Sequence, residues 1–181
     1  MSEVIYPFWH GFLANKQDGS TIVWGQLPNA LNNHTWMQTF YNSLKNENIT
    51  KIASSNFGVS GSGYTAKSSD SVAFLTKSGV VHYLTVPSHS LAPKGMSDTA
   101  FTEISSNVID IVCNDKAYAA LKSDGSVITW SEGGLGNNPD PLYGGDSSSV
   151  ANKISSGVTK IFANVYSLAA LKSDGSVVTW G

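Results

Sequence analysis

The pattern of apolar and polar positions repeats along the chain. Residues 169–180, AALKSDGSVVTW, match residues 119–130, AALKSDGSVITW, at every position but one, with a spacing of 50 residues. The preceding segments, GVTKIFANVYSL (157–168) and NVIDIVCNDKAY (107–118), also place apolar residues in matching positions. A repeat of this length indicates a structural unit that buries its apolar faces against neighbouring copies.

Two more divergent copies lie upstream. The segment VAFLTKSGVVHYLT (72–85) keeps the two apolar strands and the turn, and FLANKQDGSTIVWG (12–25) keeps an Asp-Gly turn and a Trp-Gly ending. The leading strand of the second copy is predicted at Ile49–Ala53, and Gly58–Asp70 is a Gly- and Ser-rich insertion. We therefore predict a single domain, residues 1–181, with four repeats at about 1–25, 49–85, 107–130 and 157–181, joined by linkers.

Each copy predicts three short strands. In the last copy, Val158–Phe162 is an apolar strand, followed by Asn164, a residue type that tolerates positive φ. Leu168–Leu171 is a second strand of small apolar residues, and Val177–Trp180 is a third strand that alternates and ends on a large aromatic. Between them, Ser173–Ser176 carries the Asp-Gly pair of a hairpin turn, which needs positive φ values.

These units predict an all-β fold. An isolated hairpin is marginally stable in water, so each unit must stack on its neighbours. The repeat length and the strand-rich unit favour a β-propeller, either partial or four-bladed. Short helices are expected in the linkers: an amphipathic one at Thr35–Lys45 and a helical turn at Ser147–Ile154, whereas Asn137–Pro141 is a loop.

The repeat resembles that of the regulator of chromosome condensation family, whose blades carry an Ala-Leu pair, a Gly-centred turn and a strand that ends on Trp-Gly. In the last two copies these features are Ala120-Leu121, Gly125 and Trp130, and Ala170-Leu171, Gly175 and Trp180-Gly181. The family's frequent His before the Ala-Leu pair is Ala117 and Ser167 here, and its frequent Gly is Asn114 and Asn164. The family typically closes seven blades and its members serve as interaction platforms, so the resemblance implies a propeller that binds proteins.

Composition narrows the class of partner. Charged residues make up 13% of the chain, about half the usual share, and the formal net charge is −2. The 11 Lys and Arg residues are scattered, whereas nucleic-acid-binding proteins usually carry a basic patch. We therefore predict no nucleic-acid partner and no membrane partner.

The cysteine count and the N-terminus add little about the compartment. Cys113 is the single cysteine, which excludes an internal disulfide and a cysteine-based metal cluster. The first residues lack the basic and long apolar stretches of a signal peptide, and no apolar run approaches the ~20 residues of a membrane span. The compartment is left open.

Several residues are candidates for catalysis, phosphate binding or metal binding. Asp18, Asp124 and Asp174 recur, and each begins an Asp-Gly turn in which a carboxylate accepts hydrogen bonds from local backbone N–H groups, so we assign them a structural role. His82, Ser88 and His89 lack the Gly-x-Ser-x-Gly elbow of a hydrolase, and the glycine-rich segment Gly58–Gly63 lacks the Gly-Lys-Ser/Thr ending of a phosphate loop. Asp140 and Asp146 do not follow a known calcium-loop spacing.

The tryptophans divide into two groups. Trp24, Trp130 and Trp180 recur at one repeat position and are predicted to pack between blades. Trp9 and Trp36 fall outside that position; with Tyr6, Phe8 and Tyr41 they are the candidates for an exposed contact, although the predicted helix favours core packing of Trp36.

The sequence thus predicts a non-catalytic protein-interaction or scaffolding module, with no cofactor, no metal and no binding residue that we could name. The alternative is a carbohydrate-binding propeller that uses loop aromatics and Asn or Asp side chains. The chain is expected to be a segment of a larger protein or to close its propeller as a homodimer, because an open arc of four blades leaves apolar faces at both ends. A closed ring of four blades is the competing arrangement.

Overall fold

The computed structural model describes residues 5–8, 11–16, 18, 20–25, 44–45, 47–54, 69–87, 102–131 and 143–181. The described chain is mostly β-strand, arranged as four antiparallel sheets of three strands each. The first sheet contains β1 (Ile5–Phe8), β2 (Gly11–Asn15) and β3 (Thr21–Gly25), and the second contains β4 (Ile49–Ser54), β5 (Ser69–Thr76) and β6 (Val81–Pro87). The third contains β7 (Val108–Cys113), β8 (Ala117–Lys122) and β9 (Val127–Ser131), and the fourth contains β10 (Val158–Ala163), β11 (Leu168–Lys172) and β12 (Val177–Trp180).

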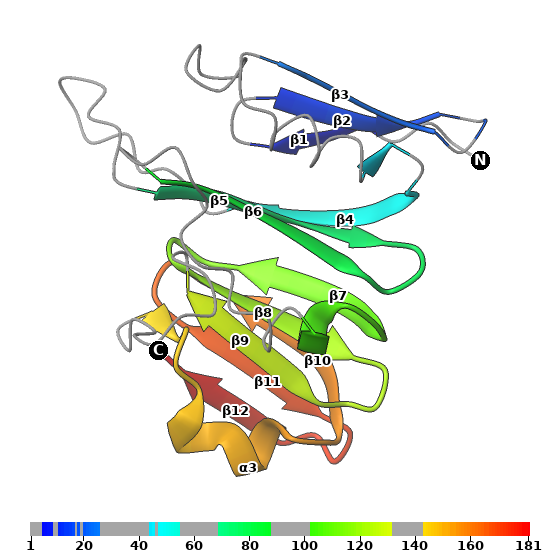
Figure 1. Cartoon of the computed structure of the whole chain (residues 1–181). Helices are drawn as coiled ribbons and strands as arrows, with labels where there is room; N and C mark the ends of the chain where they lie inside the picture. The colour runs from blue at the N-terminus through cyan, green and yellow to red at the C-terminus, as the bar shows by residue number, and fades with distance from the viewer. Residues whose placement is uncertain are drawn as a thin grey trace, which may run out of the picture.

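The sheets follow one another in chain order along the molecule (Figure 1). The first strand of each sheet lies beside the first strand of the next, so β1, β4, β7 and β10 form one row. This is the position of the innermost strands of a propeller. The first and fourth sheets lie at opposite ends, so the structure is an open stack of blades, a partial propeller, rather than a closed ring of four.

The hairpin turns explain the recurrent Asp-Gly pairs. Gly125 and Gly175 have φ values of 80° and 84°, in the region that favours glycine. The carboxylate of Asp124 accepts hydrogen bonds from the backbone N–H and the hydroxyl of Ser126, at 2.9 and 2.6 Å, and Asp174 repeats the arrangement. The structural role predicted for these aspartates is therefore confirmed. Only the glycine of each pair has a positive φ. The N–H groups of Lys122 and Lys172 donate to the oxygens of Ser126 and Ser176, which closes loops of three residues rather than two.

The turn asparagines act differently from our expectation. Among the described residues other than glycine, only Asn107 has a positive φ, so Asn114 and Asn164 do not use that conformation. Instead the side-chain oxygen of Asn164 accepts hydrogen bonds from the N–H groups of Tyr166 and Ser167, and Asn114 does the same one repeat earlier. The side chain, and not the backbone angle, therefore stabilises these turns.

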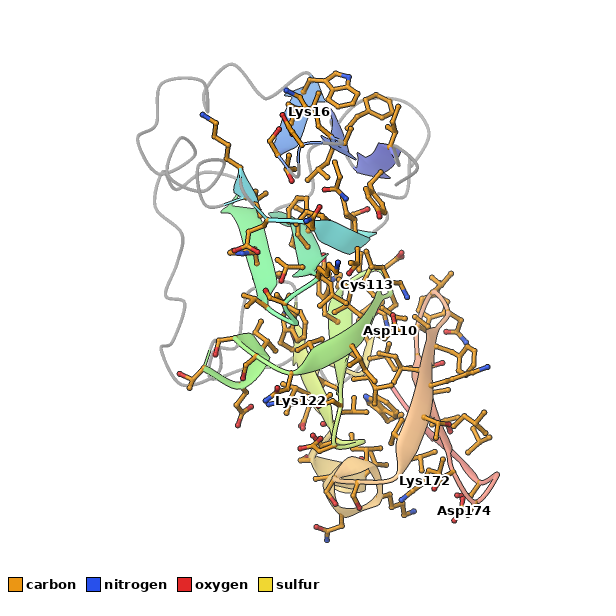
Figure 2. The ribbon with its side chains drawn as sticks, turned by 90° about the vertical axis from the view of Figure 1, so that its right-hand side faces the viewer. Lys16, Asp110, Cys113, Lys122, Lys172 and Asp174 are labelled. Atoms are coloured by element: carbon orange, nitrogen blue, oxygen red, sulfur yellow. The ribbon has the colours of Figure 1, made fainter. Side chains whose placement is uncertain are left out.

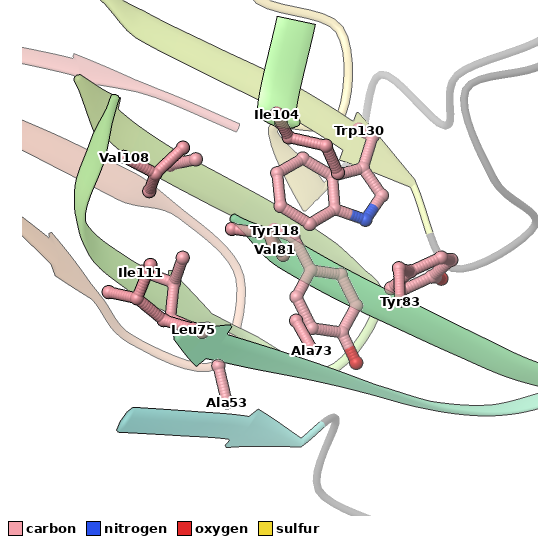
Figure 3. Close-up of a cluster of buried hydrophobic side chains, with 11 residues drawn as sticks. Ala53, Ala73, Leu75, Val81, Tyr83, Ile104, Val108, Ile111, Tyr118 and Trp130 are labelled. Atoms are coloured by element: carbon pink, nitrogen blue, oxygen red, sulfur yellow. The ribbon is translucent and has the colours of Figure 1, made fainter. Parts of the chain in front are cut away.

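An aromatic core joins the second and third sheets (Figure 3). Tyr118 and Trp130 stack with ring centroids 5.2 Å apart, and Tyr83 from the second sheet meets both rings edge-on. The hydroxyl groups of Tyr118 and Ser71 are 2.8 Å apart and share a hydrogen bond, so the polar end of the tyrosine is satisfied. The remaining members are small or branched apolar residues: Ala53, Ala73, Leu75, Val81, Ile104, Val108, Ile111 and Ala120.

A second core joins the third and fourth sheets. Trp180 occupies in it the place that Trp130 has in the first core, so the predicted burial of these two tryptophans is confirmed. The middle strand β8 contributes to both cores, with Tyr118 and Ala120 on one side and Ala117, Ala119 and Leu121 on the other. Its alanines let two sheets approach one strand closely.

The segments between the sheets can be compared with the helices, strand and loop predicted there. The helical turn expected at Ser147–Ile154 is present as a 3-10 turn, η2 (Ser148–Val150), followed by α3 (Ala151–Ile154). The leading strand expected at Ile49–Ala53 is β4. The predicted loop at Asn137–Pro141 and most of the predicted helix at Thr35–Lys45 lie outside the described residues. No helix in the described ranges is long and apolar enough to cross a membrane.

Candidate interaction surface

The fourth sheet presents an apolar face to solvent. Phe162 on β10 and Val177 on β12 are large apolar side chains with about half or more of their surface exposed. Between them, on the middle strand, Ala169 and Leu171 are partly exposed. We call the residues on this side of the sheet the open face of the fourth sheet: Lys160, Phe162, Ala169, Leu171, Val177 and Thr179.

The strands that carry this face are firmly held. Antiparallel pairing places Phe162 opposite Ala169 and Leu171 opposite Val177. Behind them, the indole N–H of Trp180 donates a hydrogen bond to the backbone oxygen of Gly144, at 2.9 Å. The face is therefore a preorganised surface whose small and branched side chains lose little entropy on binding.

Two aromatic residues lie beside the core that the third and fourth sheets share. Tyr166, in the turn between β10 and β11, is exposed and lies 5.9 Å from the ring of Tyr143. The ammonium group of Lys116 sits 5.1 Å above the Tyr143 ring, within range of a cation–π interaction. Val165 in the same turn is also exposed, and it is not one of the strand residues of the open face of the fourth sheet. Tyrosines with one apolar side and one polar end are typical of protein interfaces.

A second apolar surface lies at the other end of the stack. On the first sheet, Ile5, Phe12, Ile22 and Trp24 are all exposed large apolar residues. The rings of Phe12 and Trp24 stack with centroids 5.8 Å apart. We call this surface the open face of the first sheet, together with Ala14 between Phe12 and Ile22.

Trp24 departs from the sequence-based expectation. Trp24 was predicted to pack between blades like Trp130 and Trp180, but 42% of its surface is exposed, against 6% for Trp180. The reason is its position: the first sheet is the end of the stack, so no described sheet covers the face that carries Trp24.

The other contact candidates fall mostly outside the described chain. Trp9, Trp36 and Tyr41 lie outside it, as does the side chain of Phe8. Tyr6 is half-buried, and its hydroxyl donates a hydrogen bond to the backbone oxygen of Thr50 in the second sheet, at 3.2 Å.

The candidate residues for catalysis or metal binding that the structure describes do not come together in a cluster. Among the described residues, no three His, Cys, Asp or Glu side chains are close enough together to hold a metal ion. Asp146 accepts a hydrogen bond from the N–H of Ser148, a local turn contact. Gly58–Gly63, Ser88, His89 and Asp140 lie outside the described residues.

His82 and Cys113 are two half-buried groups whose pKa is shifted mainly by burial. Burial lowers the pKa of the His82 imidazole, against the opposing effect of the Glu47 charge. Burial also raises the pKa of the Cys113 thiol to about 12, and the charge of Asp115 acts in the same direction. A thiol with such a pKa is protonated at neutral pH, so it is a poor nucleophile.

One ion pair connects the leading strands of the second and third sheets. Lys51 Nζ lies 2.5 Å from Asp110 Oδ1, and both side chains remain partly exposed. An exposed ion pair contributes about 0–1 kcal/mol to the free energy of unfolding.

Figure 2 shows Asp110 and Cys113 on the third sheet, with Lys172 and Asp174 at the hairpin that ends the stack.

Comparison with known proteins supports the fold. The structure of human WBSCR16 aligns with a TM-score of 0.50 and 16% identity, covering 99% of this chain and 48% of that one. Yeast RCC1 (Prp20), in its complex with Kap60, aligns with a TM-score of 0.50 and 13% identity, covering 94% and 39%. The chain thus spans less than half the length of these proteins.

No known family matches the sequence. No curated protein matches it either. At these identities the structural likeness shows the propeller fold alone, so membership of the regulator of chromosome condensation repeat family stays a prediction.

Proposed function

We propose that residues 1–181 form one propeller-repeat domain that acts as a non-catalytic protein-interaction or scaffolding module. The observation that carries this proposal is the open face of the fourth sheet, a mainly apolar surface with Phe162 and Val177 exposed on paired strands. Large contiguous apolar patches are uncommon on monomeric proteins and mark sites of association. Tyr166, exposed in the turn between β10 and β11, adds a residue type that is enriched at interfaces.

A protein partner is favoured over a carbohydrate. Carbohydrate binding needs polar side chains that point to solvent with free hydrogen-bonding groups. The side chains of Asn114, Asn164, Asp124 and Asp174 accept hydrogen bonds from their own turns instead. The aligned yeast RCC1 (Prp20) was crystallised with another protein, Kap60, bound to it, which adds modest support for a protein partner.

The proposal is tested by comparing two variants in affinity capture from the native source. Val177→Asp places a charge on the open face of the fourth sheet. Val165→Asp is the matched control, because Val165 is similarly exposed and the equivalent position one repeat earlier already holds an aspartate, Asp115. We expect at least one protein that the wild type and Val165→Asp retain and that Val177→Asp loses.

A captured protein must then bind the purified chain directly, with a dissociation constant that Val177→Asp raises at least about tenfold, as for an interface residue of measurable weight. The proposal is wrong if no protein, including a second copy of the chain, distinguishes the two variants. Selective binding to a glycan array by the wild-type chain would contradict it in favour of the carbohydrate alternative.

A further inference from the structure

The open face of the fourth sheet is equivalent to a face that is covered elsewhere in the molecule. At the repeat spacing of 50, Ala169, Leu171 and Val177 correspond to Ala119, Leu121 and Val127. Those three residues of the third sheet belong to the core against the fourth sheet. Val127 is 7% exposed, whereas Val177 is 62% exposed. The fourth sheet thus carries the same apolar side chains that bind a following sheet one repeat earlier.

The open face of the first sheet is equivalent to the covered face of the fourth. Aligning Asp18 with Asp174 places the first-sheet residues against residues of the core between the third and fourth sheets. Ile5, which is 58% exposed, corresponds to Ile161, which is 4% exposed. The remaining pairs are Phe12 with Leu168, Ala14 with Ala170, Ile22 with Val178, and Trp24 with Trp180. The first sheet therefore presents the side of a blade that packs onto a preceding blade.

The hairpin turns show where a following blade would bind. The backbone oxygen of Gly79 accepts a hydrogen bond from the N–H of Val108 in the next sheet, and Gly125 accepts one from Val158, both at 3.0 Å. The Gly175 oxygen occupies the same position and has no such backbone partner among the described residues. A Cβ added at Gly125 would meet the next sheet at 2.8 Å, whereas one added at Gly175 would meet nothing within 4 Å.

We propose that the open face of the fourth sheet binds the open face of the first sheet of a second copy of this chain. Two copies then form two identical head-to-tail contacts, and their eight sheets close one ring. This proposal rests on the proposed interaction function and identifies its partner. Head-to-tail contacts close into a ring when the rotation between copies permits, and propellers of up to eight blades are common.

A second copy is the occupant that the surfaces favour. Each chain carries both halves of the contact, and the repeat equivalence makes each half similar to a surface that already packs within the chain. The open face of the fourth sheet carries one charged residue, Lys160, and the described residues of the open face of the first sheet carry none, so stacking the two faces brings no like charges together. An unrelated partner would have to cover two different apolar faces at opposite ends of the stack.

The test is analytical ultracentrifugation of the purified chain over a wide range of micromolar concentrations. We expect a species of twice the 19.2 kDa chain mass. Val177→Asp on the fourth sheet and Ile22→Asp on the first sheet should each give a monomer, because each substitution disrupts both contacts of the ring. Two affected contacts should raise the dissociation constant at least about a hundredfold. Val165→Asp should remain dimeric, and circular dichroism should show that all three variants fold.

Each other outcome overturns the inference. A wild-type chain that stays monomeric at every concentration excludes the second copy, whatever else binds the face. A dimer that survives Ile22→Asp but not Val177→Asp would join two fourth sheets, not a fourth to a first. Open-ended polymers would exclude the closed ring. If the wild type is monomeric but Val177→Asp still loses a captured protein, the interaction function holds and this inference alone fails.

Discussion

Gly125 and Gly175 occupy the same place in successive hairpins, and only Gly125 has another sheet against it. Their φ values are 80° and 84°, yet a Cβ at Gly125 would lie 2.8 Å from the backbone nitrogen of Gly157, whereas one at Gly175 would meet no atom within 4 Å. The two positions therefore separate the effect of backbone conformation from that of packing between sheets.

Alanine substitution at these two positions should have unequal effects on stability. Gly175→Ala costs about 1–2 kcal/mol, because an L-residue is placed in the left-handed region. Gly125→Ala should cost about 1–3 kcal/mol more, because the added methyl group also displaces the backbone of the next sheet. Urea denaturation measures both, in the Val177→Asp background so that no second copy covers Gly175. Equal losses would show that the sheets do not approach as described.

Trp130 and Trp24 form a similar pair at equivalent repeat positions. Trp130 is 1% exposed and stacks on Tyr118, so Trp130→Ala should lower the free energy of unfolding by about 3–5 kcal/mol. Trp24 lies on the uncovered end of the stack, so Trp24→Ala should cost no more than about 1–2 kcal/mol in the monomer. Chemical denaturation at low protein concentration compares them. A larger loss at Trp24 would contradict the order of the sheets.

The Asp174 turn predicts a dependence of stability on pH. The hydroxyl of Ser176, followed by its backbone N–H, lowers the pKa of the exposed Asp174 carboxyl from its ordinary value of 3.8. A carboxyl with a lowered folded-state pKa stabilises the fold above the unfolded-state pKa and loses that contribution as the pH falls through the folded-state value. Asp174→Ala should therefore lower the melting temperature at neutral pH.

The same difference should shrink as the pH falls below 3.8. Ser176→Ala removes the hydroxyl that donates to the Asp174 carboxylate but keeps the carboxylate itself. This variant should therefore show part of the loss in melting temperature that Asp174→Ala shows, with the same dependence on pH. Differential scanning calorimetry across the acidic range provides the comparison. A difference between wild type and Asp174→Ala that stays constant at all pH values would show that the carboxylate charge has no part in the turn.

Cys113 should be chemically quiet in the folded protein. Burial, together with the charge of Asp115, raises the pKa of the thiol to about 12, so almost none is ionised at pH 8. A thiol-specific chromogenic reagent should react slowly with the native chain and rapidly after denaturation. Rapid reaction of one equivalent in the native state would mean that this edge of the third sheet opens readily.

Much of the fold could be predicted from local residue patterns. The near-identity of residues 119–130 and 169–180 predicted equivalent hairpins, because the strand pattern and the turn glycine act within a few residues of each other. The burial of Trp130 and Trp180 followed from their shared repeat position. The candidate interaction surface could not be found in this way. Val127 and Val177 are both valines with the same neighbours in sequence, and they differ only in whether another sheet packs on them.

The sequence by itself therefore determined the repeat, the all-β class and the role of the Asp-Gly turns, all of which depend on contacts between residues close in the chain. Only the tertiary structure decided that the stack is open, that Trp24 is exposed while Trp180 is buried, and that Phe162 and Val177 face solvent. The physical reason is that a β-sheet has two faces, and burial of each face depends on whether another sheet lies beside it. A repeated pattern marks both faces as apolar in every copy but does not say where the stack ends.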